Sequence, residues 1–371
     1  MHYSWIKSIV LWPFAILYGI GVWIRNVLYD FEVLKSRSFD MPIISVGNLA
    51  VGGTGKTPHV EYLIRLLKDQ TSLAVLSRGY KRKTSGYVLA GEQSNSKELG
   101  DEPYQIHLNF PDVPVAVDAD RVHGIGCLAT DDNLNIETVL LDDAYQHRRV
   151  KPGLNILLTD YHHLFVSDHL LPIGRLREPS DRKDRADIVI VTKTPEGISP
   201  MDLRVISSQL ELHPFQKLFF SGFTYDDLIP FSITEDSDDK RIPFSSLSKE
   251  DAVLLVTGIA NPEMLISDLK RQSKKVVHLC FDDHHQFTNG DISQIKKKFQ
   301  SLSKEGERGL IVTTQKDAAR FSAMNLPDEI TNSLYVLPIE VKILNDNQEL
   351  FNQTIINYVR TNKRNSIFSK K

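Results

Sequence analysis

The residues best suited to chemistry form one glycine-rich segment that follows a short apolar run. The segment consists of Ala50, Val51, Gly52, Gly53, Thr54, Gly55, Lys56 and Thr57. Its three glycines let backbone N–H groups wrap phosphate oxygens without a Cβ in the way. The lysine can reach the β- and γ-phosphates of a nucleotide, and the final threonine hydroxyl can bind Mg²⁺. The pattern predicts a Walker A loop that binds ATP and magnesium, with alanine at a first position where the stricter pattern has glycine.

A pair of carboxylates lies about 85 residues further along the chain. The apolar run TVLLD, residues 138–142, ends in Asp142 and continues with Asp143. A carboxylate at the end of a buried strand holds magnesium directly or through water in nucleotide-binding enzymes. We therefore expect Thr57, Asp142 and Asp143 to form the metal site. Which of the two carboxylates binds the ion directly stays open.

Three other segments carry groups that could serve an acceptor. Arg78 follows the run LAVLS and is expected at the edge of the sheet where ligands of α/β proteins bind. Asp101 and Glu102 lie in the turn-prone sequence GDEP and are suited to activate a hydroxyl nucleophile, with polar capping as the alternative. The run DDHH at 282–285 contains groups that bind metals, although it lacks a third clustered ligand, and loop capping is again the alternative.

Apolar runs alternate with helical periodicity from Met41 onward. Strands are expected at 42–48, 73–77, 113–117, 138–142, 154–160 and 187–192, and a helix is expected at 56–69. Strands that alternate with helices predict βαβ units, and hence an α/β fold of the P-loop NTPase type with a doubly wound sheet. After the polar stretch 232–246, expected as a loop or hinge, further strands are expected at 252–259, 275–281 and 309–314.

This second set of strands predicts a smaller α/β lobe whose strand-to-helix loops face the first lobe. The predicted division is a membrane-associating helix at 1–30, a kinase domain at 31–230 and a smaller lobe at 231–371.

A hydrophobic run near the amino terminus departs from the ordinary composition. Ile9 to Ile24 has sixteen residues without a charge, between Lys7 and Arg25. As a helix it would span roughly 24 Å, less than the roughly 30 Å hydrocarbon core of a bilayer. Tryptophans and tyrosines in and around the run are typical of headgroup depth. We expect a monotopic helix that lies in or dips into one leaflet; a buried core helix and a strained full span are the alternatives.

The composition excludes several classes of function. The chain has 371 residues, a net charge of −3, 41% hydrophobic residues and 25% charged residues, as ordinary globular proteins do. Without a global basic field we expect no nucleic-acid partner, so an anionic ligand must be bound locally. Cys127 and Cys280 form no CxxC pattern, which favours a reducing compartment. No protein partner is evident.

Nine ordered motifs carry a resemblance to a known family. They are SVGNLAVGGTGKTP, LSRGYKR, GDEP, LLDDAYQHR, LPIGRLREP, ADIVIVTK, VTGIANPE, FDDHHQF and TTQKDAAR. In this order they resemble the tetraacyldisaccharide 4′-kinases, the lipid A 4′-kinases. The similarity runs from about Trp5 to about Arg320 and includes the hydrophobic helix, whereas the tail beyond about residue 340 has no matching signature.

The resemblance implies an activity, its cofactors and a location. It implies transfer of the γ-phosphate of ATP to the 4′-hydroxyl of a tetraacyldisaccharide 1-phosphate, which forms lipid IVA in lipid A biosynthesis. ATP and Mg²⁺ are the implied cofactors. The implied partners are the lipid A disaccharide precursor and the membrane surface. The implied location is the cytoplasmic face of the Gram-negative inner membrane, with a monotopic or peripheral attachment.

Site residues are also implied, motif by motif. Asp101 of GDEP resembles the general base, partnered by the histidine of the FDDHHQF motif. We assign that histidine to His284, which directly follows the aspartates, and His285 is the alternative. Such a pair orients the imidazole or shares the hydroxyl proton with it. Lys56 acts on the transferring phosphoryl group, and Arg78 resembles a phosphate or substrate contact.

The chain departs from the family pattern at two positions. Ala144 replaces the glycine of the DDGxQH motif, and Gln315 replaces the glutamate of TEKD. Two other classes of protein share the nucleotide motifs. A soluble small-molecule P-loop kinase or amide ligase has no use for the hydrophobic helix, and a nucleotide-dependent switch or partitioning ATPase forms no phosphorylated lipid.

Overall fold

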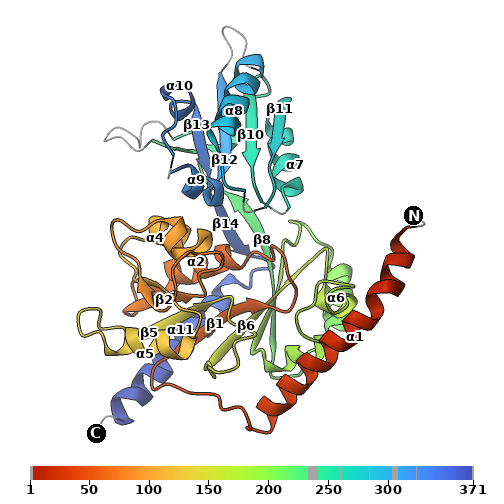
Figure 1. Cartoon of the computed structure of the whole chain (residues 1–371), viewed down its shortest axis with the longest axis vertical. Coiled ribbons are helices and arrows are strands. Elements are labelled where there is room, and N and C mark those ends of the chain that lie inside the picture. The colour runs from red at the N-terminus through yellow and green to blue at the C-terminus, as the bar shows by residue number, and fades with distance from the viewer. Residues whose placement is uncertain are drawn as a thin grey trace.

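The computed structural model describes residues 3–232, 241–259, 261–283, 285–302, 308–322 and 324–369. In this part of the chain the strands form a nine-stranded and a five-stranded sheet, one beyond the other along the long axis (Figure 1). We call the two α/β units built on them the large lobe and the small lobe. This arrangement confirms the predicted α/β fold with a second, smaller lobe.

The large sheet has the strand order β14-β8-β7-β6-β1-β5-β2-β4-β3. Its strands are β1 Ile43–Asn48, β2 Leu73–Ser77, β3 Val88–Leu89, β4 Val115–Val117, β5 Thr138–Asp142, β6 Leu154–Asp160, β7 Ile188–Thr192, β8 Lys217–Tyr225 and β14 Ile339–Ile343. All six strands expected from apolar runs form, and they run parallel, as continuous apolar runs predict.

The central strand of the large sheet, β1, positions the site. It pairs with β5 on one side, with Val46 opposite Asp142, and with β6 on the other. The strand that leads into the glycine-rich loop therefore ends beside the strand that leads into the two carboxylates. Parallel strands bring their carboxyl ends to one edge of a sheet, which is where ligands of open α/β sheets bind.

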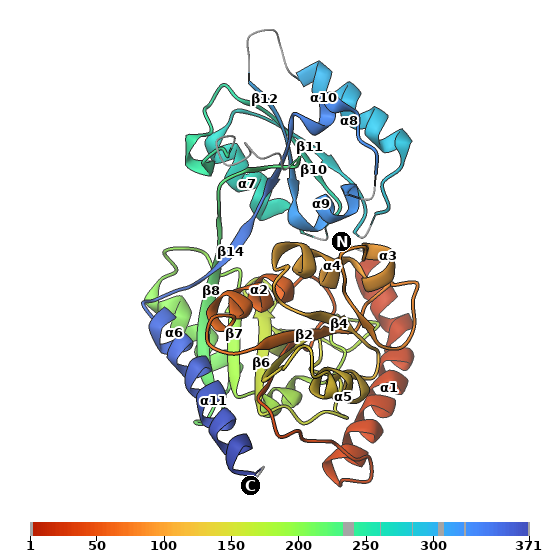
Figure 2. The same cartoon turned by 90° about the vertical axis from the view of Figure 1, so that its left-hand side faces the viewer.

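Helices cover both faces of the large sheet (Figures 1 and 2). They are α2 Lys56–Leu67, α3 Ser96–Leu99, α4 Asp101–Asn109, α5 Arg121–Thr130, α6 Pro200–Leu210 and α11 Gln348–Ser369. The helix after the glycine-rich loop, α2, buries the side chains whose periodicity predicted it, namely Val60, Leu63, Ile64 and Leu67. This face anchors the start of α2, and with it the loop, to the core of the large lobe.

The small sheet has the strand order β11-β10-β12-β13-β9. Its strands are β9 Ile229–Pro230, β10 Ala252–Thr257, β11 Lys275–Cys280, β12 Gly309–Thr314 and β13 Leu334–Leu337. Its helices are α7 Glu263–Gln272, α8 Asn289–Leu302, α9 Gln315–Phe321 and α10 Asp328–Thr331. The three strands expected here all form. The helix at the end of β12, α9, contacts α4 of the large lobe, as both views show (Figures 1 and 2).

Two antiparallel strands connect the lobes. The chain leaves the large sheet along β8 and returns along β14, which pairs with β8. The last helix, α11, then buries Phe351, Ile355 and Val359 in the core of the large lobe. Residues 339–369 thus fold on the large sheet, unlike the predicted division that gave 231–371 to the small lobe. An apolar periodicity shows that a helix has a buried face but not which of two sheets covers it. The expected hinge at 232–246 lies partly outside the described residues.

The amino-terminal helix α1 spans Tyr3–Asp30 and is 28 residues long. It is therefore about 42 Å long, and the prediction that the helix is too short to span a bilayer was wrong. The helix continues past Ile24 because polar side chains there bind the large lobe: Arg25 donates to the carbonyl oxygen of Gln146 at 2.6 Å, and Asn26 is fully buried. By length and composition alone, Val10–Asp30 is apolar enough to cross a membrane.

The two faces of α1 differ. One face lies on the large lobe, where Ala15 is buried, the Tyr18 hydroxyl donates to the carbonyl oxygen of Arg177 at 2.9 Å, and Gly19 lies against Leu170. The exposed face carries large apolar side chains, namely Val10, Trp12, Phe14, Ile16, Leu17, Ile20, Trp23 and Ile24. The alternative of a buried core helix is therefore wrong, because about half or more of the surface of each of these side chains is accessible.

Candidate active site

The glycine-rich loop has the backbone of an anion site. Gly52 and Gly55 have φ values of +112° and +83°, in the left-handed region that favours glycine. Gly55 caps α2 without a side-chain hydrogen bond to the first N–H groups of the helix. A Cβ at Gly55 would lie 2.8 Å from the Phe223 ring, so the position also has no room for a side chain. Open N–H groups at the start of a helix favour phosphate.

Neighbouring strands hold this loop in place. The Asn48 side-chain amide donates to the Thr54 hydroxyl at 2.9 Å, and the Thr192 hydroxyl donates to the Thr54 carbonyl oxygen at 3.0 Å. The N–H of Val51 donates to the carbonyl oxygen of Arg175 at 2.7 Å, and Ala50 forms a bridge with Leu176. The loop is thus preorganised, so binding a phosphate orders little additional backbone.

Lys56 and the two carboxylates meet at the carboxyl edge of the sheet. The Lys56 ammonium lies 3.7 Å from Asp143, and the Ser77 hydroxyl donates to Oδ2 of Asp142 at 3.0 Å. Burial, together with the charge of Asp143, raises the pKa of Asp142 to about 6. Burial also acts to raise the pKa of Asp143, but Lys56 and Arg177 outweigh it and lower that pKa.

These groups fit a magnesium ion. Oδ1 of Asp142 is buried and has no hydrogen-bond partner among the described residues, which leaves an oxygen ready to bind a cation. In the same part of the chain no group of three or more His, Cys, Asp or Glu side chains could hold a metal. A cation here would rely on Asp142, Asp143, the Thr57 hydroxyl, phosphate oxygens and water. Few protein ligands completed by water and phosphate are what Mg²⁺ uses in kinases.

Two arginines join this site that the motif analysis did not assign to it. Arg177 donates to Asp143 at 3.3 Å and to Oδ1 of Asn48 at 3.2 Å, and it comes from the motif LPIGRLREP. Arg121 is 2% exposed and donates to the carbonyl oxygen of Asp143 at 3.3 Å. Burial lowers the pKa of Arg121 to about 10, so the guanidinium stays charged at neutral pH. Both cations balance the two carboxylates.

Asp101 begins α4 and is buried at the contact between the lobes. Oδ2 of Asp101 accepts two hydrogen bonds from the Arg320 guanidinium, at 2.8 and 3.1 Å. Next to it, Glu102 pairs with Lys316 at 2.9 Å. Both cations come from α9 in the motif TTQKDAAR, which the sequence alone did not connect with GDEP. The charge of Glu102 is also felt by Asp142, so this contact lies near the two-carboxylate site.

The predicted partner of Asp101, His284, lies outside the described residues. The alternative histidine, His285, pairs with Asp291 of its own lobe at 3.0 Å and stacks on Phe281. Asp283 pairs with Lys316 at 3.4 Å. The described part of the DDHH run therefore serves contacts within and between the lobes.

Arg78 is exposed directly after β2. Its neighbour Ser77 binds Asp142, so Arg78 lies at the same edge of the sheet as the carboxylates. Gly79 and Tyr80 lie against Gly100, where a Cβ would be 2.9 Å from the Tyr80 carbonyl oxygen. The segment LSRGY therefore supports the residue that precedes Asp101.

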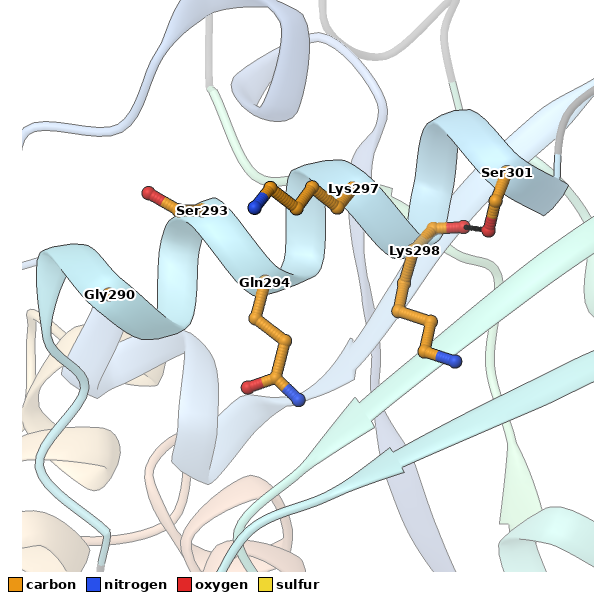
Figure 3. A pocket seen from close by; sticks show the side chains of 6 residues that line it. All are labelled: Gly290, Ser293, Gln294, Lys297, Lys298 and Ser301. Atoms are coloured by element: carbon orange, nitrogen blue, oxygen red, sulfur yellow. Dashed lines mark hydrogen bonds between the residues drawn. The ribbon is translucent and has the colours of Figure 1, made fainter.

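A hollow elsewhere contains none of the predicted site residues. It lies along α8, with Gln294, Lys297 and Lys298 among its lining (Figure 3). A second hollow, bordered by the 161–168 segment and Arg175, lies beside the glycine-rich loop through the bond between Val51 and Arg175.

Comparison with known proteins identifies the family. The family model described as "LpxK: Tetraacyldisaccharide-1-P 4'-kinase" matches residues 7–360. This chain belongs to that family. A tetraacyldisaccharide 4′-kinase of Bacteroides thetaiotaomicron is 53% identical over 97% of this chain and 96% of its own length. An enzyme of the same name from Flavobacterium johnsoniae is 44% identical over 95% of this chain and 97% of its own length.

A solved member of the LpxK family shares the fold. The crystal structure of LpxK from Aquifex aeolicus, described as an "apo" form in complex with ATP, superposes with a TM-score of 0.72 at 31% identity. The match covers 95% of this chain and 99% of that one. The predicted family and the assignment of the chain as a kinase are therefore confirmed, and the match extends past residue 340, beyond the last motif found in the sequence.

Proposed function

We propose that this chain transfers the γ-phosphate of ATP to the 4′-hydroxyl of a tetraacyldisaccharide 1-phosphate, which yields lipid IVA in lipid A biosynthesis. The observation that carries the proposal is the Walker A loop with Lys56 facing Asp143 across 3.7 Å, in a chain that matches this kinase family over residues 7–360. The ATP in the complex of the Aquifex aeolicus relative supports ATP as the donor.

The phosphates bind at the start of α2. The glycine-rich loop and the open N–H groups of the helix receive them, and the Lys56 ammonium stabilises charge on the transferring phosphoryl group. Thr57, Asp142 and Asp143 hold Mg²⁺, which when bound neutralises charge on the phosphate oxygens. The orphaned Oδ1 of Asp142 supports this assignment.

Asp101 acts as the general base. The acceptor hydroxyl oxygen forms a bond to the γ-phosphorus while the bond from phosphorus to the bridging oxygen breaks, and ADP leaves. The hydroxyl proton passes to the Asp101 carboxylate, with His284 as its partner. The position of Asp101 at the start of α4, beside Glu102 whose charge reaches Asp142, supports this role. Arg78, exposed at the same edge, contacts a phosphate of ATP or of the acceptor.

The exposed face of α1 binds the cytoplasmic surface of the inner membrane, where ATP is present. The acceptor carries four acyl chains, and exposing each CH₂ to water costs about 0.8 kcal/mol, so the enzyme must come to the lipid. The apolar face formed by Trp12, Ile16, Trp23 and their neighbours supports insertion into one leaflet. The contact of Tyr18 with Arg177 ties this helix to the catalytic edge.

The test is transfer of radiolabel from γ-labelled ATP to the acceptor embedded in vesicles, resolved by thin-layer chromatography. We expect a labelled lipid that requires both Mg²⁺ and the acceptor. Label that appears only as inorganic phosphate would favour a nucleotide-dependent switch, and label on a soluble acceptor would favour a soluble small-molecule kinase.

A further inference from the structure

A buried ion pair joins the small lobe to Asp101. Nε and Nη2 of Arg320 donate to Oδ2 of Asp101 at 3.1 and 2.8 Å, across 219 positions of sequence. The side chains are 3% and 10% exposed. Two hydrogen bonds from one planar guanidinium fix the orientation of a carboxylate as well as its position.

Arg320 is itself held by the small lobe. Its Nη1 donates to Asp317 at 2.7 Å and to the carbonyl oxygen of Gly258 at 3.0 Å. Asp317 is fully buried and accepts from the N–H of Gly258 and the hydroxyl of Thr314. The loops after β10 and β12 thus aim the guanidinium at the large lobe.

The large lobe presents Asp101 just as rigidly. Asp101 is the first residue of α4, and Gly100 before it has a φ of +94°. A Cβ at Gly100 would lie 2.9 Å from the carbonyl oxygen of Tyr80, so the backbone there is closely packed. Each lobe therefore supplies one preformed half of the pair.

Attachment of the lobes alone does not explain this arrangement. A desolvated ion pair adds little net stability, because the loss of hydration offsets the attraction. The adjacent Lys316–Glu102 pair already joins α9 to α4 at 2.9 Å. Orientation is what the guanidinium adds, and a general base must be held within hydrogen-bond reach of its proton donor.

We infer that Arg320 is a positioning residue of the kinase reaction, which sets the Asp101 carboxylate for proton transfer from the acceptor hydroxyl. The inference rests on the proposed role of Asp101 as general base. Arg320 acts through Asp101, so its removal impairs the transfer step and leaves nucleotide binding at the glycine-rich loop intact.

The test compares Arg320→Gln, Arg320→Lys and Asp101→Asn in the full-length enzyme. We expect Arg320→Gln to lower kcat about 10- to 100-fold with little change in the KM for ATP, since misplacement of a catalytic group has effects of this size. Arg320→Lys keeps the charge without the two-pronged donor and should recover part of the loss. Adding Arg320→Gln to Asp101→Asn should lower kcat no further.

Arg308→Gln is the matched control. Arg308 lies in the same lobe and binds Asp251 through two hydrogen bonds, at 2.9 and 2.5 Å. Loss of this pair affects the stability of the small lobe but should leave kcat unchanged. If Arg320→Gln does not fold, as judged by thermal unfolding, the comparison rests on Arg320→Lys and its double variant with Asp101→Asn.

The outcomes separate the inference from the proposed function. Wild-type kcat in Arg320→Gln or, where only that variant folds, in Arg320→Lys, with an inactive Asp101→Asn, would overturn the positioning role alone. Losses that multiply in the double variant would do the same. Full activity in Asp101→Asn would overturn the base assignment, and the inference with it.

Discussion

Replacement of Asp142 by asparagine should stabilise the metal-free protein while it abolishes activity. The carboxylate is buried, its Oδ1 lacks a hydrogen-bond partner among the described residues, and its pKa is raised to about 6 by burial and by Asp143. A group whose pKa is higher in the folded state than in the unfolded chain favours folding when protonated, and that contribution is lost as the pH rises through the folded pKa. At pH 7 the charged Asp142 therefore opposes folding until a cation binds it.

The size of this effect follows from the two pKa values. A rise from 3.8 to about 6 corresponds to about 3 kcal/mol at pH 7 and to about half of that at pH 5. The amide of the substituted side chain would leave an NH₂ group where the orphaned oxygen now lies, which offsets about 1–2 kcal/mol of the gain. We expect a net stabilisation of about 1–2 kcal/mol at pH 7. The change of about 1 kcal/mol between pH 7 and pH 5 does not depend on that offset.

The assay is thermal unfolding by circular dichroism in EDTA between about pH 5 and pH 7.5, the range in which a group with a pKa of about 6 titrates. The matched control is Asp143→Asn, which removes a carboxylate whose pKa Lys56 and Arg177 lower and should therefore lose stability at neutral pH. Both variants should fail to turn over ATP with lipid. An Asp142→Asn protein less stable than wild type at pH 7, or a difference that does not shrink toward pH 5, would refute the account of a carboxylate held ready for a cation.

Three further predictions concern the loop, the base and the membrane. Lys56→Ala should lose kinase activity with an unchanged melting temperature, because its charge is aimed at the phosphoryl group; near-wild-type turnover would remove the Walker A assignment. Asp101→Ala and His284→Ala should each lower kcat by about 10²–10⁴, and a double variant no worse than the less active single one would mark a unit, whereas multiplied losses would mark independent roles. Leu17→Gln with Ile20→Gln on the exposed face of α1 should weaken co-sedimentation with vesicles and activity on embedded lipid while ATP affinity stays unchanged; equal co-sedimentation would count against this face as the membrane contact.

The nucleotide site could be predicted because its parts are local. The glycine-rich loop lies between a strand and a helix, and TVLLD is a strand that ends in carboxylates, so each pattern carries its own structural context. Parallel strands bring their ends to one edge, and that rule alone places Asp142 near Lys56. The alternation of apolar runs also predicted the two sheets.

The contacts between distant segments could not be predicted. Arg177 reaches Asp143 from a loop after β6, and Arg320 reaches Asp101 from the other lobe. An arginine in a polar loop looks the same in a sequence whether it is solvated or bound to a carboxylate. The length of α1 was underestimated for a related reason, because Arg25 and Asn26 find polar partners on the large lobe and do not end the helix.

The central claim is that this chain phosphorylates the 4′-hydroxyl of a membrane-embedded tetraacyldisaccharide 1-phosphate. The most direct measurement is phosphorus NMR of the lipid product after reaction with ATP and Mg²⁺, with correlation to the sugar protons. The account predicts one new phosphate monoester, coupled to the proton at the 4′ carbon, and none with the Lys56→Ala enzyme. A phosphate on another hydroxyl, a pyrophosphate at the 1-position, or ADP formed without any new lipid signal would contradict it.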